Sequence, residues 1–214
     1  MDRKRILRVA TSLAMLVPLS YFDQQESEAA RDWGNGGFGE FLRITNQAGG
    51  PYALSVPAAV FSFSLLGNDE KFQDAAFTSL QAPIYAGLVT LFVKTTFGRS
   101  RPEDGRGARD FNPFTDINSA FPSGHATAAF AILAPWTFYY PNVFTYSLLT
   151  IGTGTAIARM ERQKHWLTDV LAGSATGLTM AYWLSRRHQG KPARVTFSPS
   201  LGRGGMGMRM SLIL

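Results

Sequence analysis

The chain has 214 residues, no cysteine, a formal net charge of +6 and a sequence pI near 9.8. This length allows one sizeable core and does not favour two full domains. The absence of cysteine excludes disulfide scaffolds, thiol nucleophiles and cysteine-ligated metal sites, so any chemistry must use oxygen and nitrogen groups.

Residues 1–22 begin with basic side chains and continue as an apolar stretch that Arg8 and Pro18 interrupt. Such a segment suits either a secretory signal peptide or a short first membrane helix. The run ESEAA at 26–30 offers small side chains for cleavage, and both interpretations stay open. Either one sends the chain to a membrane or across one, and residues 1–22 are excluded from the catalytic core.

Residues 23–51 are polar and then rich in glycine, and we expect a loop here. The run GNGGFG at 34–39 fits the glycine pattern of dinucleotide sites. That pattern needs a strand before it and a helix after it, and neither periodicity is visible. These glycines therefore predict a loop and not a nucleotide site.

Five apolar segments follow, each long enough for a helix and too long for an ordinary strand. They span residues 52–67, 75–93, 125–140, 142–158 and 170–185. Helix-stop signals separate them, including GND at 67–69, FGRSRP at 97–102 and Pro141. Together with the N-terminal segment they predict an all-α bundle of about six helices, whose functional domain covers residues 52–186.

A water-soluble bundle is allowed, because several segments are short and the mean hydropathy of −0.03 is low for a polytopic membrane protein. If all six helices cross a membrane, both basic termini lie on one side and residues 159–169 lie on the other, as the positive-inside rule favours. We expect an integral inner-membrane protein whose polar groups face the periplasm or exterior, with a secreted soluble form as the alternative.

Residues 187–214 form a basic tail, since no Asp or Glu follows Asp169. Met206, Met208, Met210 and Leu212 recur at period two, which predicts a short β-hairpin. The basic charge suits a solvated face or attraction to anionic lipid. No nucleic-acid motif accompanies it, so a nucleic-acid partner is not expected.

Three breaks between the helices carry the polar groups. Taken singly, Lys94 and Arg101 suit a helix C-terminus and Ser123 suits a helix cap. His165 and Asp169 suit a surface pair at i and i+4. If the last four helices run up and down, however, all three breaks meet at one end of the bundle.

That end would gather Lys94, Arg101 and Arg159 around the N-terminus of the helix that starts near His125. Ser123 and Gly124 would offer a hydroxyl and backbone N–H groups there. Such a cradle suits a compact oxyanion, and phosphate fits best because guanidinium forks match its oxygens.

Two histidines add reactivity to this cradle. Residues at i and i+4 share a helix face, so Asp169 can accept a hydrogen bond from one ring nitrogen of His165. The other ring nitrogen is then free to attack phosphorus. His125 lies across the site and can protonate the departing oxygen. His188 lies about a helix length beyond Asp169 and is assigned to the tail.

With these residues the sequence resembles the type 2 phosphatidic acid phosphatase (PAP2) superfamily, which includes bacterial class A acid phosphatases and vanadium haloperoxidases. KTTFGRSRP supplies Lys94, Arg101 and Pro102, and PSGH is complete at 122–125. Arg159, His165 and Asp169 match the third motif at full spacing. One departure is Ala158, where the family usually has serine, and we expect altered support of the phosphate site and not lost activity.

The resemblance implies a phosphoric ester hydrolase with His165 as nucleophile, Asp169 as its orienting partner and His125 as acid. Lys94, Arg101, Ser123, Gly124 and Arg159 would hold the phosphoryl oxygens, with no metal and no cofactor. The expected substrate is a phosphomonoester or pyrophosphate of a lipid, or a small phosphomonoester, and the expected intermediate is a phosphohistidine. The alternatives are a vanadium-dependent haloperoxidase and a non-catalytic membrane protein that binds phospholipid headgroups.

Overall fold

The computed structural model describes residues 16–117, 119–190, 194–202 and 205–213. The described chain is an α-helical bundle, which confirms the predicted fold class. Its main helices carry these bounds: α5 Ser55–Ser64, α6 Glu70–Phe97, α7 Gly124–Tyr139, α8 Val143–Glu161 and α9 Leu167–Gly190. Each of the five apolar segments of the sequence overlaps one of them, and α6, α8 and α9 extend beyond the predicted bounds.

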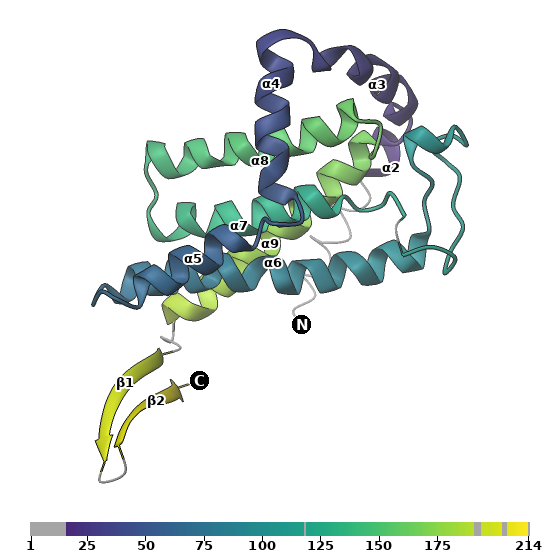
Figure 1. Ribbon diagram of the computed structural model, residues 1–214. Coiled ribbons are helices and arrows are strands. Elements are labelled where there is room, and N and C mark those ends of the chain that lie inside the picture. The colour runs from purple at the N-terminus through teal and green to yellow at the C-terminus, as the bar shows by residue number, and fades with distance from the viewer. Residues whose placement is uncertain (1–15, 118, 191–193, 203–204, 214) are drawn as a thin grey trace.

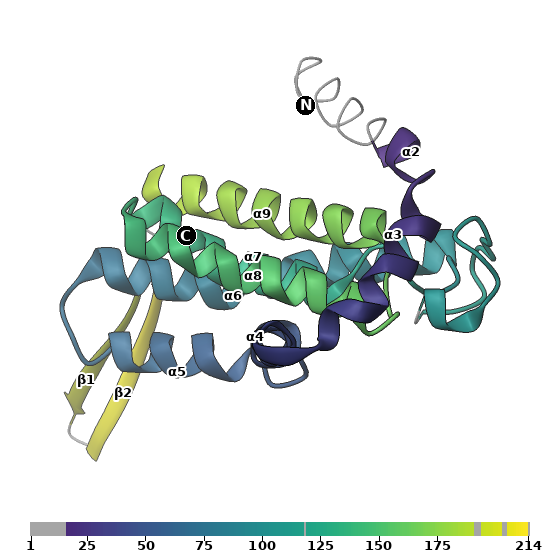
Figure 2. The ribbon, with the colours of Figure 1, turned by 90° about the horizontal axis from the view of Figure 1, so that it is seen from above.

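Helices α6, α7, α8 and α9 run side by side, with α7 in contact with the other three (Figures 1 and 2). Small side chains allow this close packing: a core cluster contains Ala82, Ala86, Ala131, Ala134 and Ala181. A Cβ atom added at Gly177 would lie 2.4 Å from the carbonyl oxygen of Thr127, so α9 approaches the backbone of α7 directly. This packing fixes the ends of the helices relative to one another.

Helix α6 ends where the sequence predicts a stop. Asp69 caps its start by accepting a hydrogen bond from Phe72 N at 3.0 Å. Gly98 ends it in the left-handed region, with φ of +58°, and donates its N–H to the carbonyl of Lys94. A Cβ at Gly98 would also collide with the carbonyl of Asn112, so the loop after α6 folds back over the helix end.

The expectation of a loop over residues 23–51 is wrong. This stretch contains two α-helices and two short 3₁₀ helices: α3 Asp23–Ala30, η1 Arg31–Gly34, α4 Gly36–Thr45 and η2 Asn46–Gly49. Helix α4 lies across α8, as Figure 1 shows. Tertiary packing outweighs the low helix propensity of the glycines, because α4 packs closely on α8: a Cβ at Gly154 would lie 2.6 Å from the hydroxyl oxygen of Thr45.

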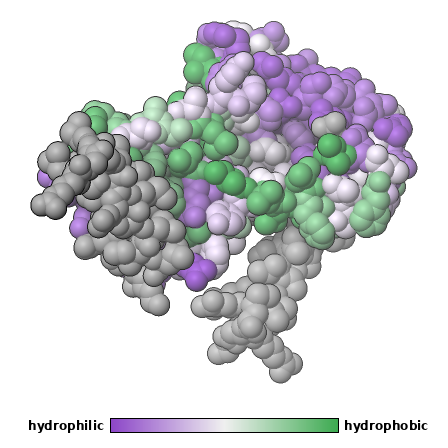
Figure 3. All heavy atoms as spheres, turned by 60° about the horizontal axis from the view of Figure 1, so that its bottom comes forward, coloured by the Kyte–Doolittle hydropathy of each residue, from purple (hydrophilic) through white to green (hydrophobic). Residues whose placement is uncertain are grey.

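Large apolar side chains are exposed along one face of α6. They are Ile84, Tyr85, Leu88, Val89, Leu91 and Phe92. Figure 3 shows hydrophobic residues in a band across the bundle and hydrophilic residues gathered at one end. By length and composition α6 is the one helix in the described chain that could cross a membrane. Helix α5 is about 15 Å long at 1.5 Å per residue, too short to cross on its own.

Helix α9 extends further than the sequence predicts. It runs to Gly190, so His188 belongs to the bundle and its assignment to a tail is wrong. His188 is buried, with Nδ1 2.8 Å from the hydroxyl of Thr78 and its ring stacked on Phe77. Beyond α9, strands β1 Arg194–Gly202 and β2 Gly205–Ile213 pair antiparallel.

Candidate active site

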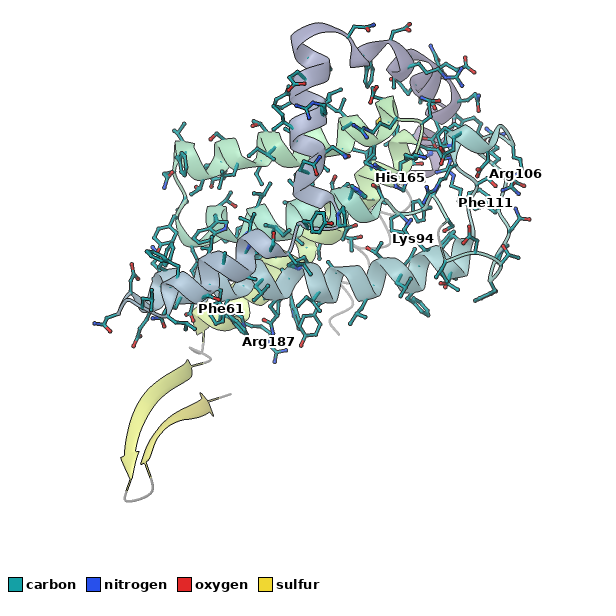
Figure 4. The ribbon with its side chains drawn as sticks, viewed as in Figure 1. Phe61, Lys94, Arg106, Phe111, His165 and Arg187 are labelled. Atoms are coloured by element: carbon teal, nitrogen blue, oxygen red, sulfur yellow. The ribbon has the colours of Figure 1, made fainter. Side chains whose placement is uncertain are left out.

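The residues that the sequence singles out meet at one end of the bundle. The C-terminal end of α6, the N-terminal end of α7 and the turn between α8 and α9 all lie there. Figure 4 shows Lys94 and His165 at this end, close to the loop that carries Arg106 and Phe111. Phe61 and Arg187 lie at the opposite end.

Lys94 lies in the last turn of α6 and forms two hydrogen bonds with Ser119. Its Nζ donates to the carbonyl of Ser119, and the Ser119 hydroxyl donates to the carbonyl of Lys94 at 2.8 Å. The charged groups that act on Lys94 are those of Arg101, Asp169, Arg159 and Asp116. Three of the predicted site residues therefore surround it.

Ser123 and Gly124 begin α7. The Ser123 hydroxyl caps the helix by accepting from Ala126 N at 3.4 Å, and the Ser123 N–H donates to the backbone carbonyl of Asp169 at 2.9 Å. Ser123 thus acts as a cap and a tie to α9. The first N–H groups of a helix have no partner within it, so those of Gly124 and His125 form an anion-binding end.

His125 lies in the first turn of α7 and is half-buried. The groups whose charge acts on it are Arg159, His165, Arg101 and Lys94, which places it within the cluster. Its backbone rests on η2, because a Cβ at Gly49 would lie 2.2 Å from the carbonyl oxygen of His125. The stretch predicted as a loop therefore supports this histidine.

His165 lies in the turn just before α9 and is almost completely buried. Its Nδ1 is 2.7 Å from the carbonyl oxygen of Ala120. Because a carbonyl can only accept, Nδ1 carries the hydrogen and Nε2 keeps its lone pair. Burial lowers the pKa of His165 to about 4, although the nearby Asp169 carboxylate opposes that shift.

The expected hydrogen bond between Asp169 and His165 is not formed. The Asp169 Oδ2 atom is 3.7 Å from Nδ1, and His165 precedes the helix, so the two do not share a helix face. Asp169 Oδ2 accepts instead from Trp166 N at 2.8 Å, which caps the start of α9. Asp169 remains the carboxylate beside Nδ1, but the Ala120 carbonyl makes the hydrogen bond.

Arg159 lies in the last turn of α8 and is 9% exposed. One terminal nitrogen reaches Asn46 Oδ1 at 3.5 Å, a long contact. The buried Nε has no hydrogen-bond partner among the described residues. A buried guanidinium with an unused donor is suited to an oxyanion ligand.

Arg101 marks the rim of the site, where it faces Glu103. The carboxylate of Glu103 lies 3.5 Å from Arg101 and 2.5 Å from Lys164. The hydrogen bond from Lys164 holds the pKa of Glu103 below its usual range, and Arg101 adds to the effect. A cavity of about 450 Å³ opens here, lined by Arg101, Glu103, Asp116 and Ser119 among others.

Sequence reasoning missed two buried charged residues, Arg99 and Asp23. Arg99 donates to Asp169 Oδ1 at 2.6 Å and to Asp23 Oδ2 at 2.7 Å. Arg99 lies in the stretch interpreted only as a helix stop, and Asp23 in the stretch interpreted as a loop. Neither has a sequence signal, because their partners are 70 and 76 residues away along the chain.

Known proteins resemble this chain in sequence. A family model described as PAP2 superfamily matches residues 76–192. Lipid A 1-phosphatase of Porphyromonas gingivalis is 33% identical over 98 residues, 43% of this chain and 20% of that protein. Lipid A 1-phosphatase of Rhizobium johnstonii is 29% identical over 44% of this chain and 40% of that protein. The chain thus matches less than half the length of these curated relatives.

Two solved structures share the fold. A transmembrane PAP2-type phosphatidylglycerolphosphate phosphatase from Bacillus subtilis has a TM-score of 0.64 at 19% identity, over 86% of this chain and 97% of that one. LpxE of Aquifex aeolicus has a TM-score of 0.56 at 15% identity, over 77% and 95%. Because the family model covers more than half of the chain and its motifs converge at one site, this protein belongs to the PAP2 superfamily.

Proposed function

We propose that the chain is a metal-independent phosphatase that hydrolyses a lipid phosphomonoester or pyrophosphate through a phosphohistidine. The observation that carries the proposal is the state of His165. Its lowered pKa makes it neutral near pH 7, and its Nδ1–H donates to the carbonyl of Ala120. Within the described residues no hydrogen-bond partner is seen for its Nε2, and the charges of Lys94 and Arg159 act on the ring. A nucleophile needs this state and a simple binding site does not.

In the first step, Nε2 of His165 attacks phosphorus and the bond to the leaving oxygen breaks. His125 gives a proton to that oxygen. In the protein alone, burial and then the nearby cations, Arg159 foremost, lower the pKa of His125 to about 4. The negative charge of the phosphate must therefore stabilise the protonated form of His125. In the second step, His125 takes a proton from water, whose oxygen attacks the phosphohistidine and releases phosphate and neutral His165. A positioned acid and base of this kind contributes about 10²–10⁴-fold.

The surrounding cations stabilise the charge that develops on the phosphoryl oxygens. Lys94, Arg101 and Arg159 supply positive charge, and the first turn of α7 supplies backbone N–H groups from Gly124 and His125. Positioning and electrostatics account for most catalysis of phosphoryl transfer, and here the protein supplies both. We therefore expect activity without a metal ion, and inhibition by vanadate.

A lipid substrate is supported by the exposed apolar face of α6 and by the relatives. That face would lie in the hydrocarbon of a membrane, so the site would open near the headgroups. The curated relatives are lipid A 1-phosphatases, and a solved relative is a phosphatidylglycerolphosphate phosphatase. We propose that the site faces the periplasm or the exterior.

The test is phosphate release, with EDTA present, from lipid A, phosphatidic acid, undecaprenyl pyrophosphate and p-nitrophenyl phosphate. The parent protein is compared with His165→Gln and with His188→Gln, the same change at the other end of the bundle. We expect turnover in the parent and in His188→Gln, and loss of at least about 10³-fold in His165→Gln. The preferred substrate identifies the lipid class.

A denaturing gel after brief incubation with ³²P-labelled substrate tests the intermediate. We expect an acid-labile phosphoprotein that is absent in His165→Gln. With labelled p-nitrophenyl phosphate, whose leaving group needs no acid, it should accumulate in His125→Ala, because only the attack of water is then slowed. Turnover that persists in His165→Gln would exclude His165 as nucleophile. Headgroup binding without turnover in the parent would favour a binding protein.

A further inference from the structure

The guanidinium of Arg99, beside the candidate site, donates five hydrogen bonds to other residues of the protein. Arginine has five N–H donors, and all of those of Arg99 are used. Nε and one terminal nitrogen donate to the carbonyl of Ala108 at 2.9 and 2.6 Å. The other bonds go to the Thr168 hydroxyl at 2.8 Å, to Asp169 at 2.6 Å and to Asp23 at 2.7 Å. Arg99 therefore has no donor left for a phosphate, unlike Arg159.

Arg99 also fixes both groups that face Nδ1 of His165. Its side chain holds the Asp169 carboxylate, which lies 3.7 Å from Nδ1. Its backbone carbonyl accepts from Ala120 N at 2.7 Å, and the carbonyl of Ala120 accepts from Nδ1. The ring of Trp166, next to the nucleophile, lies 5.6 Å from the guanidinium. The orientation of the imidazole thus depends on one residue.

Asp23 completes this arrangement from the start of α3. Its Oδ1 accepts from Thr168 N at 2.9 Å, and its Oδ2 accepts from the Thr168 hydroxyl at 2.6 Å and from Arg99. Asp23 thereby satisfies a free N–H at the start of α9. Asp23 and Asp169 are both 0% exposed and Arg99 is 3% exposed, so one guanidinium is shared by two buried carboxylates.

We infer that Arg99 and Asp23 are positioning residues, which hold Asp169 and the turn carrying His165 in the geometry for attack without touching the phosphate. The α3 segment is then part of the catalytic domain. Removing one member of a buried ion pair leaves an uncompensated charge, so the pair is sensitive to single changes. The expected loss of turnover rests on the proposed function, whereas the expected change in the position of His165 and Asp169 does not.

The kinetic test uses Asp23→Asn and Arg99→Lys, with Asp32→Asn and Arg43→Lys as exposed controls of the same chemistry. We expect kcat to fall by about 10-fold to 100-fold, by analogy with the hydrogen-bond partners that orient metal ligands. KM and the inhibition constant for vanadate should stay within about threefold, because no phosphate contact is lost. Arg101→Lys should instead raise the vanadate constant. An unchanged kcat in folded Asp23→Asn would overturn the inference.

Coupling is tested in the double variant. If Asp23 and Arg99 act as one unit, Asp23→Asn with Arg99→Lys should lose little more activity than Arg99→Lys alone. Additive losses would overturn the shared role. Melting temperatures of all variants separate a fall in kcat from a fall in folded protein, and Asp23→Asn keeps the side-chain shape if Arg99→Lys fails to fold.

A spectroscopic test needs no turnover. The chain has three histidines, so the ring nitrogens of His165 can be resolved in ¹⁵N-histidine-labelled protein. We expect a single Nδ1–H tautomer in the parent and in Asp32→Asn, and a mixture in Asp23→Asn. One unchanged tautomer in Asp23→Asn would overturn the inference. Absence of turnover in the parent would count against the proposed function alone.

Discussion

The depressed pKa of the buried His165 links protonation to folding. The pKa is about 4 in the folded chain and near 6.5 in the unfolded chain, so between these values only the unfolded chain takes up the proton. Protonation of the unfolded state lowers the free energy of unfolding as pH falls through this window. Above about pH 6.5 neither state is protonated at this residue, and the effect disappears.

The melting temperature is therefore expected to fall more steeply between pH 7 and pH 5 in the parent than in His165→Gln, which lacks the ionisable ring. The difference between the two proteins at each pH isolates His165 from every other group. Equal slopes would mean that His165 has the same proton affinity in both states.

Arg159 is the phosphate ligand whose contribution can be measured by binding. Its Nε lacks a partner in the described part of the chain and its contact with Asn46 is long, so a bound oxyanion would supply the missing acceptor. A ligand that binds only the folded state raises its stability. We expect vanadate to raise the melting temperature of the parent, and to do so much less in Arg159→Lys, which loses the guanidinium fork.

The matched control is Arg162→Lys, which changes an exposed arginine three residues further along the chain. An equal shift in Arg159→Lys would place the anion elsewhere.

Among the elements, η2 controls the position of α7. A methyl group at Gly49 would meet the His125 carbonyl oxygen at 2.2 Å, and backbone cannot give way as a side chain can. Gly49→Ala should push η2 away from the first turn of α7, lower stability by about 1–3 kcal/mol and displace His125. Gly37→Ala is the control, because no atom of the described residues lies within 4 Å of its added Cβ, apart from those of its own helix backbone and chain neighbours. Denaturant unfolding and kcat measure both effects, and a neutral Gly49→Ala would show that η2 is not in firm contact.

Much of the whole molecule follows from the sequence. The apolar segments and their stop signals predict the helices, and an up-and-down order predicts that Lys94, Ser123 and His165 meet. The sequence does not reveal η2 and α4, since their glycines form a helix only because α8 covers it. It also misplaces His165 on the same helix face as Asp169, whereas α9 begins two residues after His165, at Leu167, where the contact of Asp169 with Trp166 N caps it.

At the scale of the whole molecule, the contacts of Asp23 bear on where a signal peptide could be cleaved from the N-terminal segment. Cleavage within ESEAA, residues 26–30, would remove Asp23 and leave Arg99 with a single buried carboxylate. Cleavage after Ala29 or Ala30 would also remove the buried Ser27, whose carbonyl accepts from Gln163 at 2.7 Å. Cleavage upstream of Asp23 would leave these contacts intact.

We therefore expect the functional protein to retain Asp23, whether or not a leader is removed before it. Intact-mass measurement and N-terminal sequencing of protein from the membrane fraction check this directly. A truncation that starts at Ser20 should keep turnover and vanadate binding once it is folded in detergent, whereas one that starts at Arg31 should lose stability and turnover together. An active protein that begins at Arg31 would contradict both this expectation and the role of Asp23, because Arg99 would then hold the nucleophile's turn with Asp169 alone.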